Sequence, residues 1–163
     1  MLFRSNLLAA VLLLTYLGVP SIYYGDEIGM ESDRTVESAR QPMVWDPSRW
    51  DMKRWESYRS LIRLRNESEA IRQGSFKSLY AQGDVYGYAR FYRKETVLVV
   101  LNRGKAKTIR LDGGILGIGS GEEWTEFFTG QRIIGGERGT LELLVPAGQA
   151  MILRHGKGFS PGR

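Results

Sequence analysis

Residues Gly18–Met30 read GVPSIYYGDEIGM, and this stretch combines a helix stop, a short apolar run and a second stop. Gly18 and Pro20 end any preceding helix, because glycine adopts left-handed conformations and proline cannot continue a helix. The β-branched and aromatic run Ser21–Tyr24 then predicts a short buried strand that ends at Gly25. A strand that is apolar on both faces is typical of a parallel sheet covered by helices.

The sequence predicts a helix on each side of this strand. Upstream, Leu7–Tyr16 is apolar on nearly every side, which indicates a buried helix with Ser5 or Asn6 as its N-cap. Downstream, Asp51 is a suitable N-cap, and apolar side chains recur at helical spacing over Met52–Arg72. One such helix–strand–helix unit cannot bury its own strand, so the pattern indicates part of a larger α/β fold.

The rest of the chain has a different pattern of polar and apolar residues. Asp26–Pro47 is polar, lacks periodicity and is long enough to be a functional loop. After Gly74, short apolar runs separated by turn residues predict an antiparallel β-sandwich, with Val97–Leu101 as a central strand. The predicted strands are Phe76–Tyr80, Val85–Tyr92, Val97–Leu101, Thr108–Leu111, Glu123–Phe128, Arg132–Ile134, Leu141–Val145 and Ala150–Arg154.

Composition excludes several kinds of site. The 163 residues include no cysteine and one histidine, His155, so disulfides, thiolate metal sites and a Ser-His-Asp triad are not expected. We predict no metal and no cofactor. The net charge is +5, but the basic residues of 53–72 alternate with glutamates, as on a solvated helix face. Nucleic acid is therefore not a predicted partner.

The first nineteen residues have the basic start and apolar run of a leader peptide. The run is shorter than the roughly 20 residues that a membrane-spanning helix needs, so no membrane partner is predicted. No small-residue cleavage site follows it, which favours a buried helix and a cytoplasmic protein. Whether residues 1–19 act as a leader stays open.

Five segments resemble the α-amylase family of glycoside hydrolases. GVPSIYYGDEIGM (Gly18–Met30) resembles the eighth-strand motif of that family, and RQPMVWD (Arg40–Asp46) resembles a segment of the following loop. Tyr58–Phe76 is similar to the last barrel helix and its exit. Val97–Arg103 and Leu144–Leu153 resemble strands of the C-terminal domain. The resemblance is to the maltogenic amylase, neopullulanase and cyclomaltodextrinase group, or to the neighbouring α-glucosidases.

The resemblance implies an α+β chain: the last helix, strand and helix of a TIM barrel, followed by an antiparallel β-sandwich. Residues 1–74 would be the barrel remnant, with the seventh helix, the eighth strand, the eighth βα loop and the eighth helix. Residues 75–155 would be the β-sandwich, and residues 156–163 a flexible tail. Such barrels carry their active sites on the βα loops, which places Asp26–Pro47 on the catalytic face. The implied activity is retaining hydrolysis of α-glucosidic bonds in maltooligosaccharides, cyclodextrins or pullulan.

The catalytic carboxylates of the family are not expected in this chain. Retaining glycosidases need two carboxyl groups about 5 Å apart, and the resemblance places them on strands before Leu7. The family's N-H-D motif is missing, and the R-x-D triplets Arg49–Asp51 and Arg110–Asp112 follow the eighth-strand motif, which is the wrong order. Asp26 and Glu27 are adjacent, so they would point in opposite directions. We therefore assign no catalytic residue and expect no catalysis by the chain alone.

Substrate-binding residues are predicted in the loop and at the strand end. Arg40 offers five donors suited to sugar hydroxyls or to a carboxylate of the barrel rim. The maltogenic group has a sugar-binding aspartate four residues earlier, where this chain has Val36 with Glu37 beside it. Tyr24 presents a ring that could stack on glucose. Arg40, Glu37 and Tyr24 are the candidates, and the ligand is an α-glucan or maltooligosaccharide.

Other interpretations remain open. The β-sandwich could be a non-catalytic carbohydrate-binding or interaction module with Tyr80, Tyr86, Tyr88 and Tyr92 as its aromatics, although these could equally form a core. A small secreted β-protein with a cleaved leader is a third interpretation. The apolar segment Leu7–Tyr24 predicts a further partner, either the missing barrel half or a second copy through self-association.

Overall fold

The computed structural model describes residues 2–32, 35, 37 and 40–156, with the backbone alone for residues 2–5. Residues 157–163, which belong to the expected flexible tail, lie outside the described residues. The helices are α1 (Leu2–Thr15), η1 (Asp26–Ile28), η3 (Pro47–Arg49), α2 (Met52–Glu67), α3 (Glu69–Gln73), η4 (Gly113–Leu116) and η5 (Glu137–Gly139). The strands are β1 (Ser75–Gln82), β2 (Val85–Tyr92), β3 (Glu95–Asn102), β4 (Lys107–Leu111), β5 (Glu123–Glu126), β6 (Arg132–Ile134), β7 (Leu141–Val145) and β8 (Gln149–His155).

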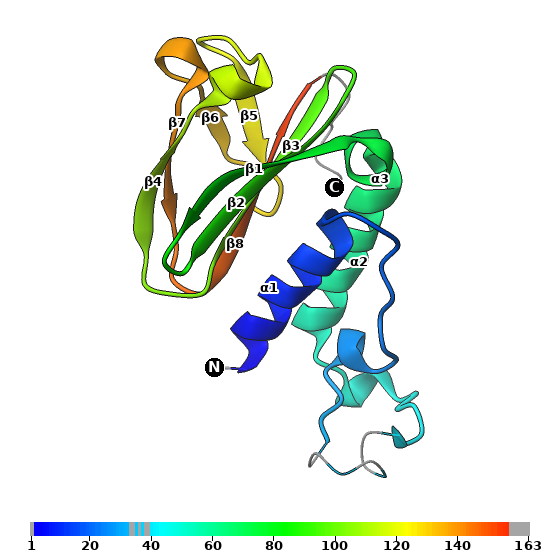
Figure 1. Cartoon of the computed structure of the whole chain (residues 1–163). Helices are drawn as coiled ribbons and strands as arrows, with labels where there is room; N and C mark the ends of the chain where they lie inside the picture. Colours follow the sequence, from blue (N-terminus) through cyan, green and yellow to red (C-terminus); the bar gives the residue numbers. More distant parts are fainter. Residues whose placement is uncertain (1, 33–34, 36, 38–39, 157–163) are drawn as a thin grey trace.

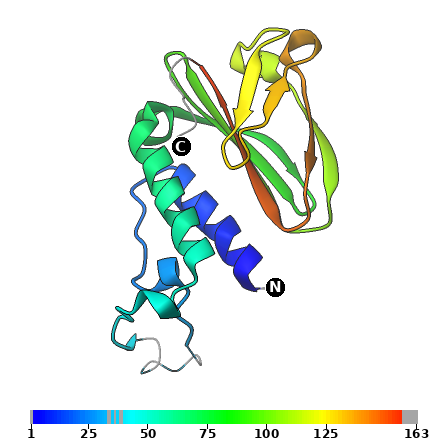
Figure 2. The same ribbon diagram turned by 180° about the vertical axis from the view of Figure 1, so that it is seen from behind.

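The strands form two antiparallel sheets. Six of them pair in the order β1-β2-β3-β8-β5-β6, and β4 pairs with β7 in a second sheet (Figure 1). The long helices α1 and α2 lie side by side next to the sandwich, as both views show (Figures 1 and 2). The predicted β-sandwich and its eight strands are confirmed, and the apolar run Val97–Leu101 is central, because β3 lies between β2 and β8.

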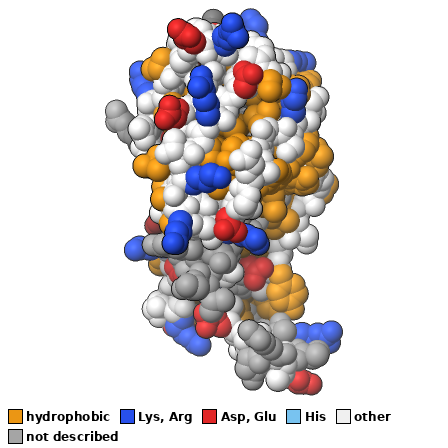
Figure 3. Space-filling view, turned by 60° about the vertical axis from the view of Figure 1, so that its left-hand side comes forward, with side chains coloured by type: hydrophobic (Ala, Val, Ile, Leu, Met, Phe, Trp, Pro, Cys, Tyr) orange, Lys and Arg blue, Asp and Glu red, His pale blue; other side chains and the backbone are white. Residues whose placement is uncertain are grey.

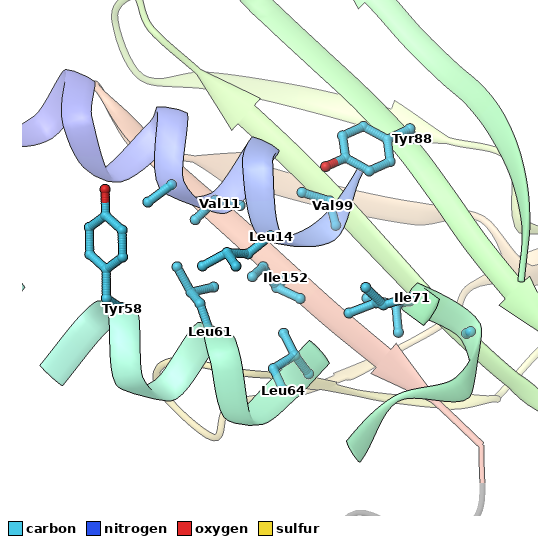
Figure 4. Close-up of a cluster of buried hydrophobic side chains, with 12 residues drawn as sticks. Val11, Leu14, Tyr58, Leu61, Leu64, Ile71, Tyr88, Val99 and Ile152 are labelled. Carbon is cyan, nitrogen blue, oxygen red and sulfur yellow. The ribbon is translucent and has the colours of Figure 1, made fainter. Parts of the chain in front are cut away.

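The six-stranded sheet separates two hydrophobic cores. Successive strand residues point to opposite faces, so Val97 and Val99 of β3 pack with the helices while Leu98 and Val100 pack with β4 and β7. Figure 4 shows the helix-side core, in which side chains of α1 and α2 meet the sheet. Its fully buried members are Ala10, Val11, Leu14, Leu61, Leu64, Ala70, Ile71, Tyr88, Val97, Val99 and Ile152.

The segment Ser21–Tyr24 is not a strand, which corrects the sequence prediction. Residues 21–23 adopt no regular structure and Tyr24 begins a turn. A parallel strand needs neighbours whose backbone groups complete its hydrogen bonds. No strand of the described residues lies beside it to supply these bonds.

The helix boundaries also differ from the predictions. The first helix begins at Leu2, so Ser5 and Asn6 lie inside it and neither is its N-cap. The apolar and basic residues before Ser5 favour helix strongly enough to extend it upstream. The predicted helix over 52–72 is two helices, because the Ser68 hydroxyl accepts a hydrogen bond from the Ile71 backbone and caps α3. The predicted cap at Asp51 is confirmed, since its carboxylate accepts from the Arg54 backbone N–H at 3.1 Å.

Two arginines hold the C-terminal end of α1. Arg90 of β2 is 2% exposed, and its Nη1 donates to the carbonyls of Thr15 and Tyr16 at 3.2 and 3.0 Å. Its Nη2 donates to the carbonyl of Gly74 at 2.9 Å. Arg65 of α2 donates to the carbonyls of Leu14 and Gly18 at 3.0 and 2.6 Å. The last carbonyls of a helix lack partners within the helix, and the two guanidinium groups supply them.

Gly74 joins the helices to the sandwich and must be glycine for steric reasons. A Cβ at this position would lie 2.3 Å from the Ala70 carbonyl oxygen and 2.7 Å from that of Phe91. Both atoms belong to the backbone, so neither can move aside cheaply. The close approach brings the Gly74 carbonyl within reach of Arg90.

Replacing Arg90 by methionine should strongly destabilise the chain. The substitution keeps a long apolar side chain but leaves three carbonyls without donors, so we expect the free energy of unfolding to fall by about 3 kcal/mol or more. Urea denaturation measures this. Arg103→Met is the matched control, because the Arg103–Asp84 ion pair is exposed and should contribute less than about 1 kcal/mol. Equal effects of the two substitutions would contradict the role given to Arg90.

Tyr88 should make the folded chain less stable at alkaline pH. Its hydroxyl lies 2.6 Å from that of Thr15 in the helix-side core. Burial raises the pKa of Tyr88 well above its ordinary value, although the hydrogen bond with Thr15 acts in the opposite direction. Above about pH 10 the unfolded chain loses this proton while the folded chain keeps it, so stability falls as pH rises.

Comparing the wild type with Tyr88→Phe tests this dependence. The variant lacks the titrating group, so its free energy of unfolding should fall less between pH 9 and pH 11 than that of the wild type. Urea titrations at several pH values measure the difference, and the other tyrosines are common to both proteins. Parallel pH profiles would contradict the prediction.

Candidate functional site

The loop that carries the predicted site is anchored on α2. Gly25 adopts a left-handed backbone conformation (φ 92°), and its carbonyl accepts from the Met30 N–H at 2.9 Å. A Cβ on Gly25 would lie 2.6 Å from the Met30 sulfur. The backbone N–H of Asp51 donates to the Ile28 carbonyl at 2.9 Å, which ties the start of the loop to the cap of α2. The loop lies at the end of the molecule away from the sandwich (Figure 1).

Tyr24 contacts the segment that contains Arg40. Its hydroxyl donates to the carbonyl of Gln41 at 2.9 Å, and its ring centre is 4.8 Å from that of Tyr23. Partial desolvation raises the pKa of Tyr24, Tyr23 acts in the same direction, and the charge of Arg40 acts against it. Tyr24 is still 42% exposed, so part of it is available for contact.

Arg40 and Glu37 are linked through the backbone. The Arg40 N–H donates to the Glu37 carbonyl at 3.1 Å, and both residues are exposed. The structure therefore brings Arg40, Gln41 and Tyr24 together. Glu37 is joined to this group by the backbone hydrogen bond from Arg40. Val36, where the resemblance would require an aspartate, lies outside the described residues.

The adjacent carboxylates Asp26 and Glu27 make separate contacts. The Glu27 carboxylate accepts from the Gly25 backbone N–H at 2.9 Å. Burial raises the pKa of Asp26, Glu27 adds to this, and the charge of Arg54 acts against it. Tyr58 has a raised pKa, mainly through its own burial and then through Asp26. Asp26 thus interacts with residues of α2, while Glu27 turns back to the backbone of Gly25.

Two tryptophans of the loop have different surroundings. Trp50 donates from Nε1 to the Val44 carbonyl at 2.7 Å, and its ring lies 6.3 Å from that of Trp55. Trp45 is 78% exposed. Trp50 therefore fastens the loop to α2, and Trp45 presents its ring to solvent.

The tyrosines of β1 and β2 form packing contacts. Tyr88 is fully buried in the helix-side core, and Tyr86 and Tyr92 are partly buried against it. Tyr80 packs against the opposite core, and the Lys107 ammonium lies 5.5 Å from its ring centre. The row of aromatics on β2 is therefore part of the core. The sequence analysis did not single out Gln41 or Phe128, whose surroundings depend on contacts distant in sequence.

Two properties of the described residues concern other classes of function. Among residues 2–32, 35, 37 and 40–156 there is no cluster of three or more histidine, aspartate or glutamate side chains able to hold a metal. Within the same residues, no helix has the length and apolar character needed to cross a membrane.

Sequence comparison connects the chain to glycosidases. Residues 76–152 match the family described as "Neopullulanase-like, C-terminal domain". Neopullulanase 2 of Thermoactinomyces vulgaris is 37% identical over 153 residues, which are 92% of this chain and 25% of that protein. A cyclomaltodextrinase of Thermoanaerobacter pseudethanolicus is 37% identical over 102 residues, 63% of this chain and 18% of that protein. The chain thus spans a quarter or less of these two relatives.

Comparison with solved structures also matches this chain to part of larger enzymes. A debranching enzyme of Nostoc punctiforme superposes with a TM-score of 0.76 and 31% identity, covering 93% of this chain and 31% of that one. An α-amylase of Geobacillus thermoleovorans superposes with a TM-score of 0.82 over 96% of this chain and 34% of that one, and at 23% identity it supports the fold alone. Residues 76–152 therefore belong to the neopullulanase-like C-terminal domain family, and the chain as a whole corresponds in sequence and fold to the C-terminal part of α-amylase-family enzymes.

Proposed function

We propose that the chain is the C-terminal portion of a retaining α-glucan hydrolase that acts on α-glucosidic bonds of maltooligosaccharides, cyclodextrins or pullulan. The observation that carries this proposal is the 37% identity with Neopullulanase 2 over 92% of the chain, which includes the GVPSIYYGDEIGM segment and its loop. Catalysis would require carboxylates that this chain does not supply, since the family's N-H-D motif is missing from the sequence.

The proposal divides the chain into two functional parts. Residues 1–74 would belong to the catalytic barrel and residues 75–155 to the β-sandwich. The change from helices to strands at Gly74 supports this division. Arg40, Glu37 and Tyr24 would contact the glucan. Their support is that they are exposed on one loop, and that Tyr24 is hydrogen-bonded to the residue after Arg40.

The proposed protein partner covers the outer face of α1. One side of this helix packs against α2 and the sheet. Leu12 and Leu13 of the helix, and Leu17 just after its end, are 37–52% exposed. Exposed apolar side chains also gather on the face of the β-rich part shown in Figure 3. The remaining barrel would bury the α1 residues, and without it the chain would self-associate through them.

The lack of cysteine supports a cytoplasmic location.

A chimera tests the function. The barrel-forming part of Neopullulanase 2 joined ahead of Met1 should hydrolyse cyclodextrin and pullulan, while the unfused chain should release no reducing sugar from either. In the chimera, Arg40→Ala should raise KM by roughly tenfold to a hundredfold, because a charged hydrogen bond contributes about 1.5–3 kcal/mol.

Arg110→Ala in the same chimera is the matched control, because Arg110 is an exposed arginine of β4 outside the predicted site. Its KM should match that of the unsubstituted chimera. Turnover by the unfused chain would overturn the proposal that carboxylates from outside it are needed. An unchanged KM for Arg40→Ala would remove Arg40 from the substrate site.

A further inference from the structure

A cavity of about 610 Å³ lies beside the sandwich, distant in sequence from the loop of the predicted site. Its walls come from the loop between β5 and β6, the turn between β7 and β8, and the first half of α1. The loop between β5 and β6 can be followed in Figure 2. The volume lies within the range of about 300–1,000 Å³ that is typical of small-molecule sites.

One wall of this cavity is the aromatic ring of Phe128. The ring is 41% exposed, and Phe127 packs against it edge-on with ring centres 5.1 Å apart. Phe127 is held in turn by the sheet, because its backbone N–H donates to the Ile152 carbonyl at 2.8 Å. Phe128 therefore lines the cavity while remaining partly exposed to solvent.

The loop that carries Phe128 is fixed by Glu126. This carboxylate is 4% exposed and accepts from the backbone N–H and the hydroxyl of Thr129, each at 2.7 Å. Its second oxygen accepts from the Ile152 N–H at 3.3 Å. The contacts satisfy both oxygens inside the protein and stiffen the loop, so a ligand would meet a preorganised wall.

The polar side chains of the cavity include two uncharged carboxamides, the Thr129 hydroxyl and the internally bonded Glu126 carboxylate. Gln131 and Gln149 line it and are exposed, and each amide can donate and accept at once. Among the described residues that line the cavity, Glu126 is the one ionisable group, and no lysine or arginine is present. The lining therefore suits a neutral ligand with paired donors and acceptors on an apolar body, since polar groups fix orientation in a mostly apolar site.

We propose that this cavity is a second saccharide site, which takes glucose units of a neutral α-glucan with a sugar face on Phe128 and hydroxyls on Gln131 and Gln149. The choice of glucan rests on the proposed function, whereas the neutral and amphipathic character of the ligand rests on the cavity itself. The site belongs to the β-sandwich and would bind glucan without catalysis. It would retain a long substrate whose other end occupies the barrel.

The test is calorimetric titration of the unfused chain with maltoheptaose and β-cyclodextrin. Phe128→Ala should weaken binding by about tenfold or more, the effect of losing about 1.4 kcal/mol. Phe128→Tyr should keep the affinity, because the ring face is retained. Ile115→Ala, which removes an exposed apolar side chain outside the cavity, should also leave it unchanged. Circular dichroism and thermal melting confirm that each variant is folded.

Two further variants separate this proposal from its competitors. Gln149→Leu should weaken saccharide binding; unchanged or tighter binding would show an apolar site and overturn the proposal. Binding that is lost in Arg40→Ala but kept in Phe128→Ala would place the sugar on the loop and overturn the second site, while supporting the proposed function. If the chain binds neither saccharide, the second site is overturned, and hydrolysis by the chimera still decides the proposed function independently.

Discussion

The packing of the helices on the sheet depends on where the Arg90 guanidinium lies. A buried positive charge is costly unless hydrogen bonds to suitable acceptors compensate it, and for Arg90 the two terminal nitrogens make these bonds. The free carbonyls at the end of α1 carry the negative end of the helix dipole, so they are suitable acceptors. By bonding them and the Gly74 carbonyl together, Arg90 fixes the end of α1 against the point where the chain passes from helix to strand. Tyr88, two residues earlier on the same strand face, then meets Thr15.

This arrangement places the two suggested glucan contacts on different parts of the molecule. The loop with Tyr24 and Arg40 is attached to α2 through Ile28 and Asp51. The cavity with Phe128 is built on the sandwich and touched by Leu7 of α1. Because α1 and α2 pack against each other and both contact the same core, the two regions are parts of one packed body. A polymeric ligand could therefore meet both at a fixed separation, and a short oligosaccharide would occupy one at a time.

The sequence predicted the sandwich because its signals are local. Short runs of apolar and β-branched residues separated by turn residues mark the strands, so every strand was found near its observed position. The segment Ser21–Tyr24 failed for the opposite reason, since its preference for a strand has no effect without a neighbour to pair with. The split at Ser68 depends on one hydroxyl hydrogen bond, and periodicity over 52–72 cannot reveal it.

The sites were harder to predict because they depend on long-range contacts. Arg40, Glu37 and Tyr24 were found through a family motif and stay predictions. The hydrogen bond from Tyr24 to Gln41 joins residues 17 apart and has no signature in spacing. Phe128 was assigned to the end of a predicted strand over 123–128. The observed strand ends at Glu126, because that carboxylate caps the following turn and leaves the ring at the surface.

The contact between α1 and Arg90 also affects how the chain folds during its synthesis. Thr15 and Arg90 are 75 residues apart, so α1 is synthesised long before the strand that completes it. At about 5–20 residues per second, the ribosome needs roughly 4–15 s to bridge that distance. During this interval the last carbonyls of the apolar helix lack the donors that Arg90 later supplies. The contacts that hold the end of α1 can therefore form only after β2 has been synthesised.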